Sequence, residues 1–121
     1  MKPVAEGERI VANIHETEFE PYIGRDGETD GYALQLDRSK PLGTGFHVYK
    51  MEPGYTTIAH EHGHDEEFLV ISGDVTDNDG TVYREGDLVL MKAGTQHCSR
   101  TEHGCLIAVY IEPGEDAFKP V

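Results

Sequence analysis

Residues 54–73, which read GYTTIAHEHGHDEEFLVISG, are the segment that decides the fold and the chemistry of this chain. His60 and His62 lie on a predicted strand, where residues two positions apart point to the same face. Strand geometry separates their Cβ atoms by about 7 Å, so both imidazoles can converge on one ion. Glu66 follows at the start of an apolar strand. An unpaired carboxylate is costly in an apolar interior, so the pattern predicts a metal ion as its partner.

A third histidine, His97, begins another predicted strand directly after a glycine turn. Three neutral imidazoles and one carboxylate form a donor set suited to Fe(II), Mn(II), Zn(II), Ni(II) or Cu(II). The sequence therefore predicts one divalent metal ion bound by His60, His62, Glu66 and His97. The alternative is a set of unrelated polar residues on strands.

The remaining histidines and the second glutamate are predicted to lie outside this site. Glu67 has the opposite strand parity and is expected to face solvent. His64 is expected at the surface or beside the ligands, because Gly63 and Asp65 indicate a turn. His47 is expected to be satisfied or exposed rather than to face the barrel. His15 and His103 are expected at the surface.

Short runs of alternating apolar and polar residues, separated by 14 Gly and 6 Pro, predict an all-β fold. No segment has a helical apolar stripe over three turns. The first thirty residues are expected to pack outside the barrel, and the tail EDAFKPV to be loosely held. The predicted strands are 9–13, 31–37, 44–52, 55–62, 66–72, 74–76, 81–84, 87–91, 97–100 and 105–111, and the predicted core contains Leu34, Leu36, Val48, Phe68, Val70, Leu88, Leu90, Ile107 and Val109.

The spacing of these residues resembles the two motifs of the cupin family. The first motif, G-x5-H-x-H-x3,4-E-x6-G, is matched at every fixed position by Gly54, His60, His62, Glu66 and Gly73. In the second motif, G-x5-P-x-G-x2-H-x3-N, the matches are Gly86, Gly94 and His97, whereas Lys92 replaces the usual Pro and Thr101 the usual Asn. The resemblance implies a cupin jelly-roll β-barrel, with one domain over residues 1–121 and a core at about 31–112.

A finer resemblance, to the ChrR-type cupin group, lies in the double Glu66-Glu67, the acidic turn between the motifs and Gly104-Cys105 before the last predicted strand. That group includes the cupin half of zinc-binding anti-sigma factors. The chain is also similar to small cupin dioxygenases that cleave diketones and hydroxyketones. No Cys/His cluster precedes His60, so a sigma-factor role is not implied.

Charge and cysteine content narrow the classes of partner. Ten Lys plus Arg against 23 Asp plus Glu give a formal net charge of −13, which disfavours binding to nucleic acids and to anionic membranes. No apolar run reaches the roughly 20 residues of a membrane-spanning helix. Cys98 and Cys105 are expected to be reduced, although pairing across a hairpin is open. We expect a cytoplasmic protein.

Two classes of function follow from the resemblance. The first is a metal-dependent enzyme, an Fe(II) dioxygenase acting on a small carbonyl or enol substrate. The second is a non-catalytic module that uses its metal for binding or sensing a ligand. The sequence identifies no acid or base outside the metal ligands, so catalytic residues stay unassigned. Covering of exposed sheet edges favours a homodimer, which the resemblance also implies.

Overall fold

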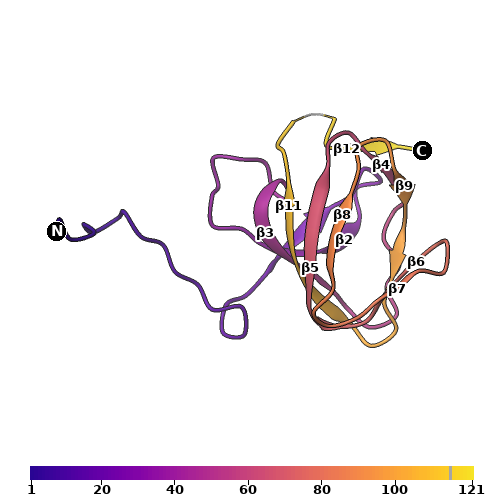
Figure 1. Cartoon of the computed structure of the whole chain (residues 1–121), viewed down its shortest axis with the longest axis horizontal. Helices are drawn as coiled ribbons and strands as arrows, with labels where there is room; N and C mark the ends of the chain where they lie inside the picture. Colours follow the sequence, from indigo (N-terminus) through magenta and orange to yellow (C-terminus); the bar gives the residue numbers. More distant parts are fainter. Residues whose placement is uncertain (115) are drawn as a thin grey trace.

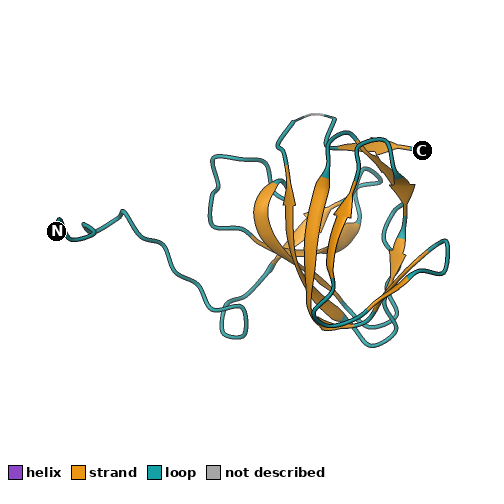
Figure 2. Cartoon of the chain, viewed as in Figure 1, coloured by secondary structure: helices purple, strands orange, loops and turns teal. Residues whose placement is uncertain are grey.

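The chain folds into antiparallel β-sheets in a computed structural model that describes all of residues 1–121 except 115. The described residues contain twelve strands and no helix (Figure 2). The strands are β1 (Glu20–Ile23), β2 (Thr29–Leu34), β3 (Gly45–Met51), β4 (His60–His62), β5 (Glu66–Gly73), β6 (Val75–Asp77), β7 (Val82–Tyr83), β8 (Leu88–Met91), β9 (Gln96–His97), β10 (Ser99–Arg100), β11 (Cys105–Ile111) and β12 (Phe118–Pro120).

The strands form one large and two small sheets that together wall a barrel (Figure 1). The six-stranded sheet has the order β1-β2-β3-β11-β5-β8, and the small sheets are β10-β6-β7 and β12-β4-β9. All pairings are antiparallel. This architecture confirms the predicted jelly-roll fold.

The interior of the barrel is lined by alternate residues of the long strands. In β5 the buried residues Glu66, Phe68 and Val70 alternate with the exposed Glu67 and Leu69. β11 lies between β3 and β5 and spans the predicted 105–111 segment. Period-two alternation therefore delivers apolar side chains to one interior and carries Glu66 there with them.

Three residues of the predicted core are exposed instead. Leu88 and Leu90 are 79% and 52% exposed, because pairing with β5 places Val89 opposite the inward-facing Phe68 and turns both leucines outward. Leu36 is 43% exposed, because β2 ends at Leu34 and no strand carries its side chain inward.

The two ends of the chain also differ from expectation. Residues 9–13 form no strand, and this part of the N-terminal segment runs away from the barrel (Figure 1). By contrast, β1 and the start of β2 lie in the six-stranded sheet rather than outside the barrel. Within the tail, β12 pairs with β4, so it is held by backbone hydrogen bonds; residue 115 of the tail lies outside the described residues.

Of the other predicted strands, the 55–62 segment is a strand only at His60–His62, and 97–100 is divided between β9 and β10. The predicted strands 74–76 and 81–84 correspond to β6 and β7, which pair with each other across the Asp77–Gly80 turn. Both small sheets are thus built from short strands, and the β12-β4-β9 sheet carries the three histidines of the motifs.

Candidate metal centre

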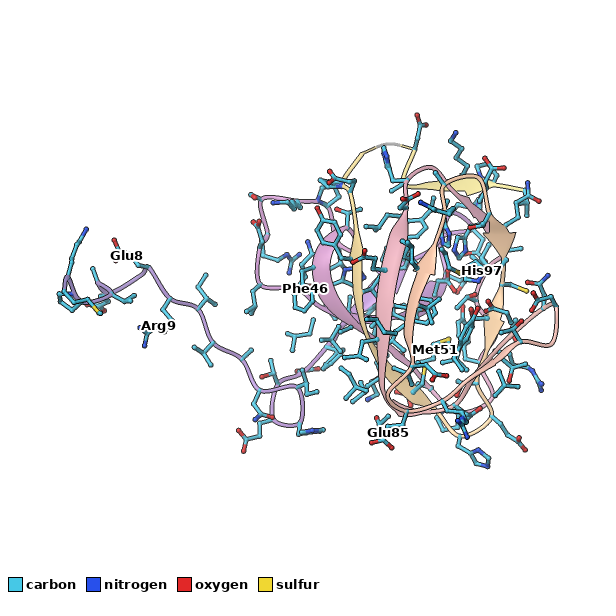
Figure 3. The ribbon with its side chains drawn as sticks, in the orientation of Figure 1. Glu8, Arg9, Phe46, Met51, Glu85 and His97 are labelled. Carbon is cyan, nitrogen blue, oxygen red and sulfur yellow. The ribbon has the colours of Figure 1, made fainter. Side chains whose placement is uncertain are left out.

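Three histidines meet at one end of the barrel because β4 and β9 are neighbouring strands. His60 lies directly opposite His97 in the β4–β9 ladder, and His62 is two residues further along β4 on the same face. The ring centroids lie 4.8 to 5.0 Å apart in all three pairs. One nitrogen from each ring lies within 4.8 Å of the others, an arrangement that could hold a metal ion. Figure 3 shows the His97 side chain inside the barrel.

The outer nitrogens of His60 and His62 are fixed by hydrogen bonds. His60 Nδ1 lies 2.9 Å from the carbonyl oxygen of Ile58, which can only accept, so Nδ1 carries the proton. His62 Nδ1 lies 3.0 Å from Thr95 Oγ1, which donates its own hydrogen to the Lys92 carbonyl. His62 Nδ1 is therefore also a donor. In both neutral rings the lone pair is on Nε2.

These two lone pairs face each other. His60 Nε2 and His62 Nε2 are 3.2 Å apart, with no proton between them in the neutral rings. Two nitrogens bound to one ion at about 2.0–2.1 Å would be separated by about 3 Å, so the observed spacing fits a shared cation. Burial lowers the pKa of His60, and burial and the neighbouring imidazoles lower the pKa of His62 to about 3. Both rings are thus kept in the neutral form that binds metals.

His97 is oriented by a carboxylate that the sequence reasoning missed. Its Nδ1 lies 3.1 Å from Asp77 Oδ2, but the N–H is not aligned with that oxygen, so this buried nitrogen has an ionic contact without a hydrogen bond. Asp77 accepts hydrogen bonds from Tyr83 and Ser99, at 2.7 and 2.6 Å. Burial lowers the pKa of His97, but the contact with Asp77, together with the nearby Glu66 and Asp79 carboxylates, outweighs burial and raises that pKa above its usual value. Metal-bound histidines commonly have such a carboxylate behind them.

Glu66 is buried beside the histidines at the start of β5. Its Oε1 lies 3.5 Å from His62 Nε2. Burial raises the pKa of Glu66 to about 7, and the nearby His97 offsets part of that rise. The carboxyl group is thus close enough to approach a common ion, although it lies outside the tight group formed by the three imidazoles. Its neighbour Glu67 is exposed, as its parity predicts.

A cavity of about 410 Å³ leads from this centre into the barrel. His60, Glu66 and His97 form its polar end. Its apolar wall consists of Met51, Phe68, Val75, Ile107 and Val109. A mostly apolar cavity with a few convergent polar groups is the usual form of a small-molecule site.

The C-terminal strand β12 closes one side of the centre. The Phe118 ring lies 5.2 Å from the His60 ring at an interplanar angle of 87°, an edge-to-face contact. Gly63 permits this packing, because a Cβ at that position would lie within 1.6 Å of the Asp116 carbonyl oxygen. No sequence pattern indicates this wall, since Phe118 is 56 positions from His62 and meets it only through sheet pairing.

The remaining histidines are placed as follows. His47 is buried and lines the cavity, with Nδ1 3.1 Å from the Gly45 carbonyl; it is satisfied, as predicted, and yet it faces the interior. His64 is half-buried outside the three-histidine group. His15 and His103 are exposed, as predicted. Both cysteines are free, so no bond crosses the predicted hairpin.

Residues 8–114 match the family model of the ChrR cupin-like domain. The chain belongs to that family. The match covers both histidine strands and Glu66, and it confirms the resemblance drawn from the spacing of the motifs. A search of the curated proteins gives no significant match.

Several solved structures have the same fold at low sequence identity. An uncharacterized conserved protein with a double-stranded β-helix domain from Klebsiella pneumoniae is 21% identical, with a TM-score of 0.64, over 98% of this chain and 96% of that one. The complex of SigE with the anti-sigma ChrR from Rhodobacter sphaeroides is 17% identical, with a TM-score of 0.59, over 80% of this chain and 50% of that one. An acetylacetone dioxygenase from Acinetobacter johnsonii is 12% identical, with a TM-score of 0.61, over 90% of this chain and 76% of that one. At these identities the likeness shows the fold alone.

Among the described residues, no helix has the length and apolar character needed to cross a bilayer.

Proposed function

We propose that this protein is a metal-dependent enzyme of dioxygenase type that acts on a small carbonyl or enol substrate. His60, His62, Glu66 and His97 bind one divalent ion, with Fe(II) as the catalytic metal and Zn, Mn or Ni as other occupants. The observation that carries the proposal is the pair of unprotonated Nε2 atoms 3.2 Å apart at the end of a mostly apolar cavity. A divalent cation relieves the repulsion between these lone pairs.

In this proposal, some residues orient the metal ligands and others form the substrate cavity. Ile58, Thr95 and Asp77 hold the three rings from behind, so that their other nitrogens stay directed at one point. A bound Fe(II) ion would supply Lewis acidity toward the substrate oxygens and a site for dioxygen. The apolar wall excludes water from the bound substrate and accommodates its carbon skeleton.

The first experiment is metal analysis of the purified protein, followed by oxygen consumption of the Fe(II) form with a panel of small diketones. Glu66→Gln tests the fourth ligand, and Glu67→Gln is its matched control, because that neighbour is exposed on the other face. We expect Glu66→Gln to lower metal affinity and oxygen consumption about tenfold or more, and Glu67→Gln to leave both unchanged. Parent protein that binds less than one equivalent of every divalent metal offered would refute the proposal.

A second candidate is a non-catalytic module in which the same metal holds a ligand. The match to the ChrR cupin-like domain favours it, because the matched structures include the anti-sigma ChrR complex. Such a module would bind one metal ion but consume no oxygen with any member of the panel. Its melting temperature would also depend strongly on the metal, since binding energy would then be folding energy.

We also propose that the protein is a cytoplasmic homodimer. Large apolar side chains lie exposed on neighbouring strands of the six-stranded sheet, and we infer that a second copy covers this face. They are Phe46, Leu69, Leu88, Leu90 and Tyr110 (Figure 3 labels Phe46). In light scattering we expect twice the chain mass for the parent and a monomer for Leu88→Glu; a monomeric parent at micromolar concentration would contradict the proposal. The two free thiols suit a reducing compartment.

A further inference from the structure

Arg25 is held over the rim of the cavity by the turn that joins β1 to β2. This turn is closed by hydrogen bonds from Gly24 N to the Glu28 carbonyl and from Gly27 N to the Gly24 carbonyl. The Arg25 side chain bonds to the segment that leads into β4, where Nη2 donates to the Ala59 carbonyl at 2.8 Å. Ala59 directly precedes His60, so the guanidinium is fixed to the strand that carries two of the histidines.

The charge of Arg25 is not balanced by an ion pair. Among the described residues, no carboxylate oxygen lies within 4.0 Å of its guanidinium. The adjacent Asp26 instead accepts a hydrogen bond from Glu28 N. Asp30, which also lines the cavity, uses Oδ1 to accept from the Tyr55 hydroxyl and from Ile58 N.

Arg25 is also the one Lys or Arg among the described residues that line the cavity. Its side chain is exposed to solvent, whereas His60 is half-buried and His97 is buried. The cavity is thus mostly apolar, with the Arg25 cation and the histidine centre among its few polar groups.

We infer that the natural ligand is a small organic acid that carries a carbonyl or hydroxyl oxygen at its other end. Its carboxylate pairs with the guanidinium of Arg25, and its second oxygen points to the His60–His62–His97 centre. One guanidinium nitrogen is engaged by Ala59, and the rest of the planar fork can bind a carboxylate. This inference rests on the proposed metal-dependent function and narrows its substrate class from carbonyl compounds to keto or hydroxy acids.

The test compares acids with neutral molecules of nearly the same shape. Acetoacetate is paired with acetylacetone, and levulinate with acetonylacetone; in each pair a methyl group replaces one carboxylate oxygen. Dissociation constants are measured by calorimetry on zinc-loaded protein, in which no oxygen chemistry takes place. We expect at least one acid to bind about tenfold or more tightly than its neutral counterpart, with the preference decreasing as salt rises.

Variants then test whether Arg25 causes the preference for the acid over its neutral counterpart. Arg25→Gln should weaken binding of the preferred acid about 10- to 100-fold and leave its neutral counterpart within twofold, and Arg25→Lys should fall between the parent and Arg25→Gln. Arg84→Gln is the matched control, because it makes the same charge change at an exposed side chain outside the cavity lining. Its constants should equal those of the parent.

The outcomes separate this inference from the proposed function. Equal binding of acid and neutral molecule, no binding of either acid, or an acid preference that survives in Arg25→Gln overturns the assignment of Arg25. Failure of the parent to bind zinc overturns the proposed function instead. In that case the acids and their neutral counterparts are measured on the metal-free protein. A preference for the acid that is present in the parent and lost in Arg25→Gln would still support the contact with Arg25. A parent without that preference, or a variant that keeps it, would refute the contact.

Discussion

Replacing Asp77 by Asn tests whether a buried carboxylate sets the metal affinity of the centre. Asp77 Oδ2 lies 3.1 Å from His97 Nδ1, and both side chains are buried. Through the imidazole, an ion on Nε2 would lie about 7 Å from that oxygen, given ordinary metal–nitrogen distances. At an effective dielectric constant of about 20, this corresponds to about 2 kcal/mol per unit charge, or about 4–5 kcal/mol for a divalent ion, which is an upper bound because neighbouring charges and solvent screen part of it. The asparagine amide keeps the shape of the side chain but removes this attraction.

We therefore expect Asp77→Asn to lower zinc affinity about 10- to 100-fold, the range found when carboxylates behind metal-bound histidines are changed. The assay is competition with a chromophoric chelator at neutral pH. Asp79→Asn is the matched control, because its exposed carboxylate caps only the backbone N–H of Thr81. Melting of both variants by circular dichroism establishes that they are folded. An Asp77→Asn affinity within twofold of the parent would refute the reasoning.

Three further predictions concern the centre and the core. His62→Ala should abolish metal-dependent turnover but lower the melting temperature by only about 5–10 °C, because the site loses one fully buried ligand and the apolar core is kept; an unfolded chain would instead indicate a structural metal. Gly63→Ala should displace β12 and make the C-terminus sensitive to proteases, since its Cβ would overlap the backbone of Asp116; protection equal to that of the parent would contradict this. Burial raises the pKa of Cys105 to about 11, so at pH 8 its thiol should stay protonated and react with a disulfide reagent only after unfolding, whereas rapid reaction of two thiols in the native protein would disprove this.

The common face of His60 and His62 could be predicted because it depends only on their spacing within one strand. On a strand, the i, i+2 spacing of His60 and His62 fixes a common face. The alternation of β5 likewise predicts that Glu66 is buried and Glu67 exposed, as the structure shows. Neither inference requires knowledge of a partner strand. The meeting of β4 with β9 is not local, and it was expected only through the resemblance to cupin motifs.

The faces of β8 could not be predicted from its composition. Its sequence, Leu-Val-Leu-Met, is apolar on both sides, so hydrophobicity cannot distinguish the inward from the outward set. The register with β5 decides the matter, because it sets Val89 against Phe68 and Met91 against Glu66. The outward leucines then become part of the exposed sheet face, which is why the error in the predicted core and the proposed dimer surface have the same origin.

Asp77 was missed although a local signal existed. The segment Asp77–Gly80 was interpreted as a turn, and a turn already accounts for an aspartate. Strand parity with Val75, however, places Asp77 on the inward face of β6, and both residues are buried. A buried aspartate needs partners, so parity alone could have indicated a polar group within reach, here His97.

The residues that were predicted and those that were not have different roles in the proposed site. In the proposed site the motif strands would supply the donors to the metal, whereas Arg25 and Phe118 come from the β1–β2 turn and the C-terminal strand, outside both motifs. Their contacts, to Ala59 and to His60, join positions 34 and 58 residues apart. Such contacts leave no periodic trace in the sequence, because a turn tip or a chain end can vary without disturbing the alternation of the barrel strands. The chemistry of the centre can therefore be inferred from the motifs, but the selection of a substrate depends on segments whose position only the folded chain reveals.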